Sequence, residues 1–471
     1  MDLHEFRETG HHLIDLLADH LESVEDRPVF PKVEPRQLYE LFAESIPQDT
    51  ADLPAVLAEL EKKLLPYIAQ VNHPGYFGYI TPSPTPVGIL ADLITSALNQ
   101  NVALYAIGPS AVALERRTVR WLTDLVGYGD EAGGNLTSGG TMANFIGLKL
   151  ARDWASGDRA QHEGVRDRWT VYTSEERHVS VDKAVDSIGL GREQLRIVPT
   201  DDRFRTSIGA LEQAIENDRA TGFRPMCILG MGGSTNTGAV DPLRELRRVA
   251  DHHDMWLHVD AAYGGGMLLS RDYPDILDGI ALADSVTIDP HKWFYAPLDA
   301  GAILVREERR LTHSFGMRPA YLTDKMDPEE VRYDYFVHGF EQSRRLRALK
   351  VWMSLKRYGA RQMGAWVDAN VGHARRLFEL AAQEPDFEAA VEPPMSAVCL
   401  RYAPGGAGEE ELERLHANVA RRVEESGRYW ISTTRLKGRT YFRINPVNFR
   451  TRTEHVEGLF ELLKEESRRR L

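Results

Sequence analysis

A lysine that follows a short apolar run is the residue of this chain whose position most clearly suggests a role in catalysis. Residues 284–289 (DSVTID) are typical of a buried strand, and Pro290, His291, Lys292 and Trp293 follow at once. Such a lysine is partly shielded from water, and its amine can attack a carbonyl carbon to form a Schiff base. Most lysines are ordinary surface side chains. The assignment therefore depends on the residues that accompany it.

Two further strand ends carry an aspartate and a histidine. Asp260 lies within 256-WLHVDAA-262, where small residues such as Ala262 leave room for a flat ring. A carboxylate there can keep the nitrogen of a pyridine ring protonated. His178 follows the apolar run 169–174, and its planar side chain could stack on the same ring. Taken singly, the aspartate could equally cap a helix and the histidine could fill a core position.

Two glycine-rich turns complete the set. Residues 138–144 (SGGTMAN) open a predicted helix, where the backbone amides of Gly140 and Thr141 would hold a phosphate with help from the helix dipole. The turn has neither the lysine of a P-loop nor the spacing of a dinucleotide fingerprint. Residues 230–242 supply hydroxyl groups, Thr235 among them. A phosphate cradle, a stacking imidazole, a ring-nitrogen carboxylate and a Schiff-base lysine together predict a pyridoxal 5′-phosphate (PLP) site.

The elements that must position these residues alternate between strands and helices. This alternation predicts an α/β fold with a mostly parallel central sheet flanked by helices, and ligands bind at the C-terminal ends of such strands. We divide the chain into an N-terminal helical arm (1–85), a large cofactor-binding domain (86–350) and a small C-terminal α+β domain (351–471). The predicted strands of the large domain are 169–174, 195–199, 226–231, 256–262, 284–289 and 302–306.

Composition disfavours several classes of protein. The formal net charge of −13 over 471 residues argues against a nucleic-acid partner. Two cysteines, Cys227 and Cys399, cannot build a disulfide framework or a multi-cysteine zinc site. The histidine pairs at 11–12 and 252–253 point to different helix faces, so we expect no metal. Without a signal segment or a long apolar run, we expect a cytoplasmic protein that does not contact membranes.

At these motifs the sequence resembles the aromatic-L-amino-acid decarboxylase family, the group II PLP-dependent amino-acid decarboxylases. The resemblance covers most of the chain, including residues 73–80, 138–144 and 344–350. Its most specific part is the pair formed by 258-HVDAA-262 and 290-PHKW-293. It implies the architecture of a fold-type I PLP-dependent enzyme, an obligate homodimer and the loss of CO₂ from an L-amino acid.

The resemblance also implies roles for single residues. Lys292 would form the Schiff base with the cofactor, and Asp260 would pair with the ring nitrogen. His178 would act in catalysis by stacking on one face of the ring, while Ala262 packs against the other. Asp289 replaces an asparagine that is often found in the family, and its role stays open. The family's remaining cofactor contacts fall on Gly140, Thr141, Thr235 and His291.

A proton donor for the substrate carbon is expected from the charged, turn-rich segment 321–340, which has the character of a mobile lid. Counting back from 344–350, Tyr335 falls where the family's decarboxylases carry a loop tyrosine with this role. Tyr333 and His338 remain alternatives. A non-acidic residue at that position would favour oxidative formation of an aldehyde.

Charge suggests the class of substrate. Residues 64–115 contain neither lysine nor arginine, and they include the two segments that line the substrate pocket in the family. An acidic side chain would need a cation there. We therefore expect a neutral, aromatic L-amino acid of the tryptophan, tyrosine, phenylalanine or DOPA type as substrate, with a large aliphatic amino acid or aromatic aldehyde synthesis as alternatives. The candidate pocket residues are Tyr76, Phe77, Tyr79, Asn101 and Ala103.

Two other classes could use a similar cofactor site. An aminotransferase would need an arginine that binds the substrate carboxylate. Arg443 could be mistaken for such an arginine. A PLP-binding regulator would carry a DNA-binding module, and no such stretch precedes the predicted sheet. Both classes are less favoured than a decarboxylase.

Overall fold

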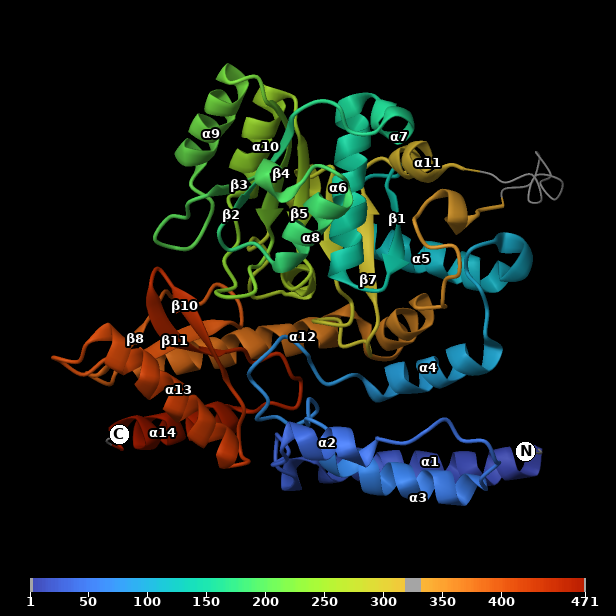
Figure 1. Ribbon diagram of the computed structural model, residues 1–471, viewed down its shortest axis with the longest axis vertical. Coiled ribbons are helices and arrows are strands. Elements are labelled where there is room, and N and C mark those ends of the chain that lie inside the picture. Colours follow the sequence, from blue (N-terminus) through green and yellow to red (C-terminus); the bar gives the residue numbers. More distant parts are fainter. Residues whose placement is uncertain (1–2, 318–331, 470–471) are drawn as a thin grey trace. The chain divides into compact units, whose positions relative to one another are not determined.

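The computed structural model describes residues 3–317 and 332–469 (Figure 1). The chain folds into two compact units. The first boundary, after Ser83, lies close to the predicted one at 85. The second falls at Gly372/His373, inside the long helix α12 (Ala348–Ala382), and not at the predicted position 350. The arm and the C-terminal region therefore belong to one unit. Unit 1 contains Met1–Ser83, His373–Ala390 and Cys399–Leu471, and unit 2 contains Pro84–Gly372 and Val391–Val398.

Unit 2 is built on a seven-stranded sheet of order β1-β7-β6-β5-β4-β2-β3. The strands from β3 to β6 in this order are parallel, and β7 runs antiparallel to both β6 and β1. All residues of β2, β5 and β6 are buried, as a sheet covered on both faces requires. The prediction of a mostly parallel α/β fold is confirmed. The strands are β1 (Gly133–Thr137), β2 (Trp169–Ser174), β3 (Leu195–Val198), β4 (Arg224–Met231), β5 (Trp256–Asp260), β6 (Ser285–Ile288) and β7 (Gly301–Val305).

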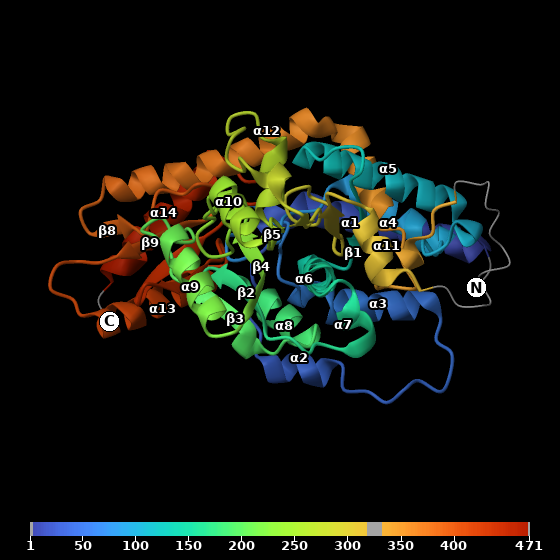
Figure 2. The ribbon, with the colours of Figure 1, turned by 90° about the horizontal axis from the view of Figure 1, so that it is seen from above.

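Helices cover both faces of this sheet (Figure 2). On one face, α6 (Gly140–Ser156) crosses β4 to β7, with α8 (Val179–Ser187) beside it. The other face carries α10 (Leu243–His253) on β4 and β5 and α5 (Pro109–Val126) on β1 and β7. The remaining helices of unit 2 are α4 (Pro86–Leu98), α7 (Arg159–Glu163), α9 (Ile208–Ala220), α11 (Arg309–Phe315) and the first part of α12, which has a kink at Gly359.

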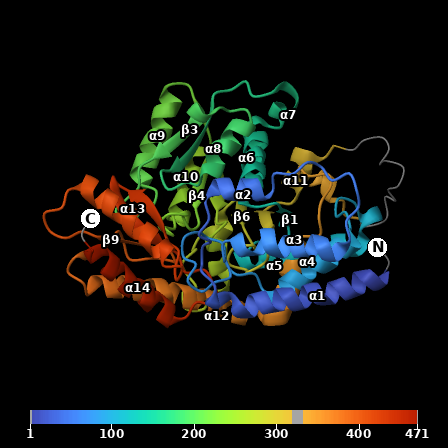
Figure 3. The ribbon, with the colours of Figure 1, turned by 60° about the horizontal axis from the view of Figure 1, so that its bottom comes forward.

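Unit 1 combines the N-terminal helices with a second, smaller sheet. The sheet has the order β10-β11-β9-β8, and α13 packs against α14 beside it (Figure 3). Among the described residues, no helix combines the length and the apolar character that a membrane span requires. The elements are α1 (Leu3–Glu22), α2 (Pro35–Leu41), α3 (Leu53–Lys63), β8 (Phe387–Ala389), β9 (Val398–Tyr402), α13 (Glu409–Glu425), β10 (Ser432–Leu436), β11 (Arg439–Ile444) and α14 (Thr453–Arg468).

Candidate active site

One cavity in unit 2, of about 250 Å³, is lined by all eight residues that were predicted from the sequence to bind the cofactor. They come from the start of α6 and from the segments that follow β2, β4, β5 and β6. The sheet topology explains the meeting, because the C-terminal ends of these four parallel strands lie along the same edge. The eight residues are Gly140, Thr141, His178, Thr235, Asp260, Ala262, His291 and Lys292.

The start of α6 borders the cavity with backbone amides. The first amides of a helix have no acceptor within the helix, so they are available to an anion. Gly140 begins α6, and a Cβ atom there would lie 2.9 Å from Asp289 Oδ2 and 3.1 Å from Ala262 Cβ. The residue before it, Gly139, has a φ of 143°, which side chains rarely tolerate. Glycine therefore allows the helix start to approach the strand ends closely.

The segment after β6 places Lys292 and His291 on either side of a buried carboxylate. Lys292 Nζ lies 3.2 Å from Asp289 Oδ2, and His291 Nε2 lies 3.5 Å from the same oxygen. The second oxygen of Asp289, Oδ1, is buried without a hydrogen-bond partner among the described residues. The structure thus places the aspartate, whose role the sequence left open, in direct contact with the candidate Schiff-base lysine.

His291 faces this carboxylate in a defined tautomer. The amide of Ala300 donates to His291 Nδ1 over 3.1 Å. Because Nδ1 accepts, the proton of the neutral ring is on Nε2, the nitrogen nearer to Asp289. Burial lowers the pKa of His291, which favours this neutral form.

Asp260 ends β5 with both carboxylate oxygens hydrogen-bonded. The amide of Ala262 donates to Oδ1 over 3.0 Å, and Asn144 Nδ2 donates to Oδ2 over 2.7 Å. The side chain is 4% exposed. Both carboxylate oxygens thus accept N–H donors, and a carboxylate in this place can hold a proton on a ring nitrogen.

His178 caps the N-terminus of α8. Its Nδ1 accepts the Ser180 amide over 3.2 Å and lies 2.9 Å from Ser180 Oγ. Burial is the largest influence on the pKa of His178 and lowers it. A neutral, fixed imidazole at the cavity wall suits stacking on an aromatic ring.

A buried glutamate, which sequence reasoning missed, fixes the turn that carries Thr235. Glu176 Oε2 accepts hydrogen bonds from Ser234 Oγ over 2.9 Å and from Thr237 Oγ1 over 3.0 Å. Burial raises the pKa of Glu176, and the two hydroxyl donors oppose that shift. The available signal was the position of Glu176 two residues before His178.

The candidate proton donors do not line this cavity. Tyr335 begins the short helix η8 (Tyr335–Val337) and is 1% exposed, with the Arg344 guanidinium 4.3 Å from its ring centre. Burial raises the pKa of Tyr335 well above its usual value. Tyr333 stacks on His338, with ring centres 4.1 Å apart. Of the predicted lid, residues 321–331 lie outside the described part of the chain.

The five candidate pocket residues fall into two groups. In unit 1, three aromatic residues pack near Trp430 and Tyr429: Tyr76 and Phe77 are buried, and Tyr79 is 58% exposed. In unit 2, Asn101 Oδ1 accepts the amides of Ala103 and Arg344. These contacts do not test a role in substrate binding, which stays a prediction.

The cavity fits PLP by the chemistry of its lining. Helix amides stand where a phosphate would bind, the Lys292 amine can bind an aldehyde carbon, and the buried Asp260 carboxylate suits a protonated ring nitrogen. Asp289 is a second carboxylate in the lining, and Lys292 and His291 lie against it. The residues present can therefore hold the cofactor.

Comparison with known proteins points to the same chemistry. Residues 35–403 match the model of the pyridoxal-dependent decarboxylase conserved domain. The chain is 32% identical to an aromatic-L-amino-acid decarboxylase of Bacillus atrophaeus, over 98% of this chain and 95% of that protein. It is 28% identical to a phenylacetaldehyde synthase of Arabidopsis thaliana, over 99% and 96%. A crystal structure of Oryza sativa TDC with PLP and tryptamine superposes with a TM-score of 0.91 at 26% identity, covering 99% and 98% of the two chains. This chain belongs to the family of pyridoxal-dependent decarboxylases.

Proposed function

We propose that the protein is a homodimeric cytoplasmic decarboxylase that converts a neutral, aromatic L-amino acid into its amine and CO₂. The observation that carries the proposal is the single cavity that joins Lys292, Asp260 and His178 to the amides at the start of α6. Cys227 and Cys399 are both buried and neither forms a disulfide bond, as is usual in a reducing compartment.

The residues of the cavity divide the work of the reaction. When bound, PLP supplies an electron sink for the electron pair that remains at Cα after CO₂ leaves. Lys292 would supply the amine that binds the aldehyde of the cofactor. Asp260 would hold a proton at the ring nitrogen, His178 would pack on the ring, and the amides of Gly140 and Thr141 would hold the phosphate.

A panel of amino acids tests the substrate class. We expect tryptophan, tyrosine, phenylalanine or DOPA to give a higher kcat/KM than leucine, and glutamate to be the poorest substrate, because residues 64–115 offer no cation for a second carboxylate. CO₂ and amine are measured together by mass spectrometry. Release of a keto acid that depends on an added acceptor would identify an aminotransferase, and rapid decarboxylation of glutamate would contradict the assignment.

Aldehyde synthesis is the second candidate, because one relative is named phenylacetaldehyde synthase. That outcome needs an oxidant, and its products differ from those of simple decarboxylation. Aldehyde formed in step with the consumption of dioxygen would establish it. Equal amounts of amine and CO₂ support the decarboxylase.

The proton donor is tested by two tyrosine variants. Tyr335 is the predicted donor, although it is buried, and Tyr333 and His338 are the predicted alternatives. The same segment also contains Tyr321, which lies outside the described residues. Loss of the donor should lower amine formation by about 10² to 10⁴ and divert product to aldehyde. We expect this from Tyr335→Phe. Unchanged amine output from that variant, with aldehyde from Tyr321→Phe, would move the role to Tyr321.

Exposed apolar side chains on one face of α4 support the homodimer. Leu90, Leu93, Ile94 and Leu98 follow helical spacing and are each at least 40% exposed in the single chain. Light scattering should give twice the chain mass of 53.1 kDa. Leu93→Glu should shift the mass toward the monomer, while Ile197→Glu, at an exposed apolar residue of β3, should not. A monomeric wild-type protein would contradict the dimer.

A further inference from the structure

A series of buried hydrogen bonds in unit 2 connects the two ends of β5, and Asn144 of α6 is its centre. The Asn144 side-chain nitrogen donates to Asp260 Oδ2 over 2.7 Å and to Ser180 Oγ over 3.0 Å. Its oxygen accepts from Thr287 Oγ1 over 2.8 Å and lies 3.0 Å from His258 Nε2. The residue is 1% exposed. All four hydrogen-bonding positions of this amide are therefore occupied.

The orientation of the amide is set from the far end of β5. Trp256 Nε1, which can only donate, lies 2.9 Å from Ser285 Oγ. The Ser285 hydroxyl is then free to donate to His258 Nδ1, 2.8 Å away. Burial lowers the pKa of His258 to about 4, so the ring is neutral. Because Nδ1 accepts from Ser285, the one ring proton is on Nε2. That proton points to Asn144 Oδ1, which leaves the amide nitrogen facing Asp260.

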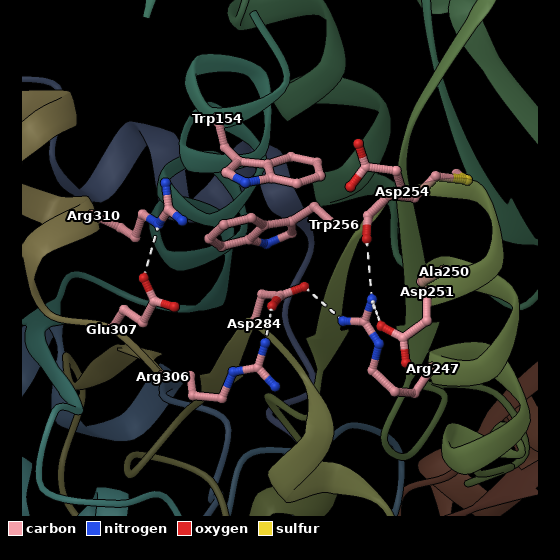
Figure 4. Close-up of a pocket in the computed structure, with 11 residues that line it drawn as sticks. Trp154, Arg247, Ala250, Asp251, Asp254, Trp256, Asp284, Arg306, Glu307 and Arg310 are labelled. Atoms are coloured by element: carbon pink, nitrogen blue, oxygen red, sulfur yellow. Dashed lines mark hydrogen bonds and ion pairs between the residues drawn. The ribbon is translucent and has the colours of Figure 1, made fainter. Parts of the chain in front are cut away.

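Trp256 is held in place outside the cofactor cavity. It lies beside Trp154, with ring centres 5.9 Å apart, in the wall of a second, polar pocket (Figure 4). In the same pocket, Asp284 Oδ2 accepts the Leu257 amide and pairs with Arg247 Nη1, both at 2.8 Å. These contacts fix the first residues of β5, where the series of hydrogen bonds begins.

We propose that Asn144 is a positioning residue that keeps the Asp260 carboxylate aimed at the ring nitrogen of the cofactor, and that the hydrogen bonds from Trp256 hold the amide of Asn144 in the required orientation. An ionised carboxylate only accepts hydrogen bonds, so an amide oxygen turned toward Asp260 would repel it. Asn144 also helps to orient His178 through Ser180. Ser180 Oγ accepts from Asn144, so the Ser180 hydroxyl proton is available to His178 Nδ1. The proposal rests on the cofactor assignment and not on the choice of substrate.

Equilibrium binding of PLP and of its 1-deaza analogue to the cofactor-free protein measures this role. The analogue has a C–H group in place of the ring nitrogen, so it cannot donate to Asp260. Wild-type protein should prefer PLP. Asn144→Asp keeps the shape of the side chain but sets two carboxylates against each other, and such a pair shares a proton. Its preference for PLP should fall by about tenfold or more, while its affinity for the analogue stays close to that of wild type.

A remote pair of variants provides the matched control. Trp256→Phe removes the indole N–H without changing any residue that lines the cofactor cavity, and it should also reduce the preference for PLP. Trp154→Phe removes a similar area of neighbouring ring and should leave the preference unchanged.

The outcomes separate a positioning role from a structural one. Thermal melting of each cofactor-free variant first checks that it folds. Wild-type preference in Asn144→Asp, or equal loss of affinity for both ligands, would overturn the proposal. If Asn144→Asp does not fold, equal preferences in Trp256→Phe and Trp154→Phe would overturn it. Wild-type protein that binds neither ligand would instead contradict the cofactor assignment.

Discussion

Replacing Lys292 by alanine is expected to lower kcat by at least about 10³. The lysine amine lies at the cavity wall, 3.2 Å from Asp289 Oδ2, and is the group that we propose binds the cofactor covalently. Without it, PLP is held by its phosphate and ring contacts alone. Initial rates of CO₂ release at saturating substrate and PLP measure the effect.

A surface lysine serves as the control for this variant. Lys356 is exposed on α12, and Lys356→Ala should keep the wild-type rate. Binding of PLP to the Lys292→Ala protein, measured separately, distinguishes lost chemistry from lost cofactor. A rate within tenfold of wild type for Lys292→Ala would remove the lysine from the reaction.

Asp260→Asn is expected to lower kcat by about 10² to 10³, the range that follows the loss of one well-placed electrostatic partner. The substitution preserves the shape but removes the charge that, in the proposed role of Asp260, keeps the ring nitrogen protonated. In the wild type, the Asn144 nitrogen and the Ala262 N–H both donate to the Asp260 carboxylate. In the variant these donors face a side-chain amide instead. An unprotonated ring would withdraw less electron density from Cα. The visible spectrum of the bound cofactor should change together with the rate.

The control for this change is another aspartate in unit 2. Asp275 is exposed, and Asp275→Asn should leave both the rate and the spectrum unaltered. Retention of more than a tenth of the wild-type kcat by Asp260→Asn would show that the ring nitrogen does not depend on this carboxylate.

Local sequence pattern predicted the core of the fold well, because buried parallel strands have a strong apolar signal. The predicted strand 169–174 matches β2, and 284–289 differs from β6 by one residue at each end. Strand β1 was missed. Its sequence, GGNLT, has a low strand propensity, and its pairing with β7, more than 160 residues away in sequence, places it in the sheet.

The cofactor site was predictable to the extent that its residues follow strand ends. Lys292, Asp260 and His178 each stand just beyond an apolar run, so their meeting at one edge follows from the topology. Asn144 gave no such signal, since an asparagine inside a helix is ordinary until its partners on two strands are known. The burial of Tyr335 beneath Arg344 likewise depends on contacts distant in sequence from the loop pattern.

Reduction of the purified protein with borohydride in the presence of PLP, followed by peptide mass mapping, shows whether Lys292 binds the cofactor as an imine. We expect one pyridoxyl-phosphate adduct, located on Lys292, together with the loss of visible absorbance. An adduct on a different lysine, or no adduct, would exclude Lys292 as the residue that binds the cofactor.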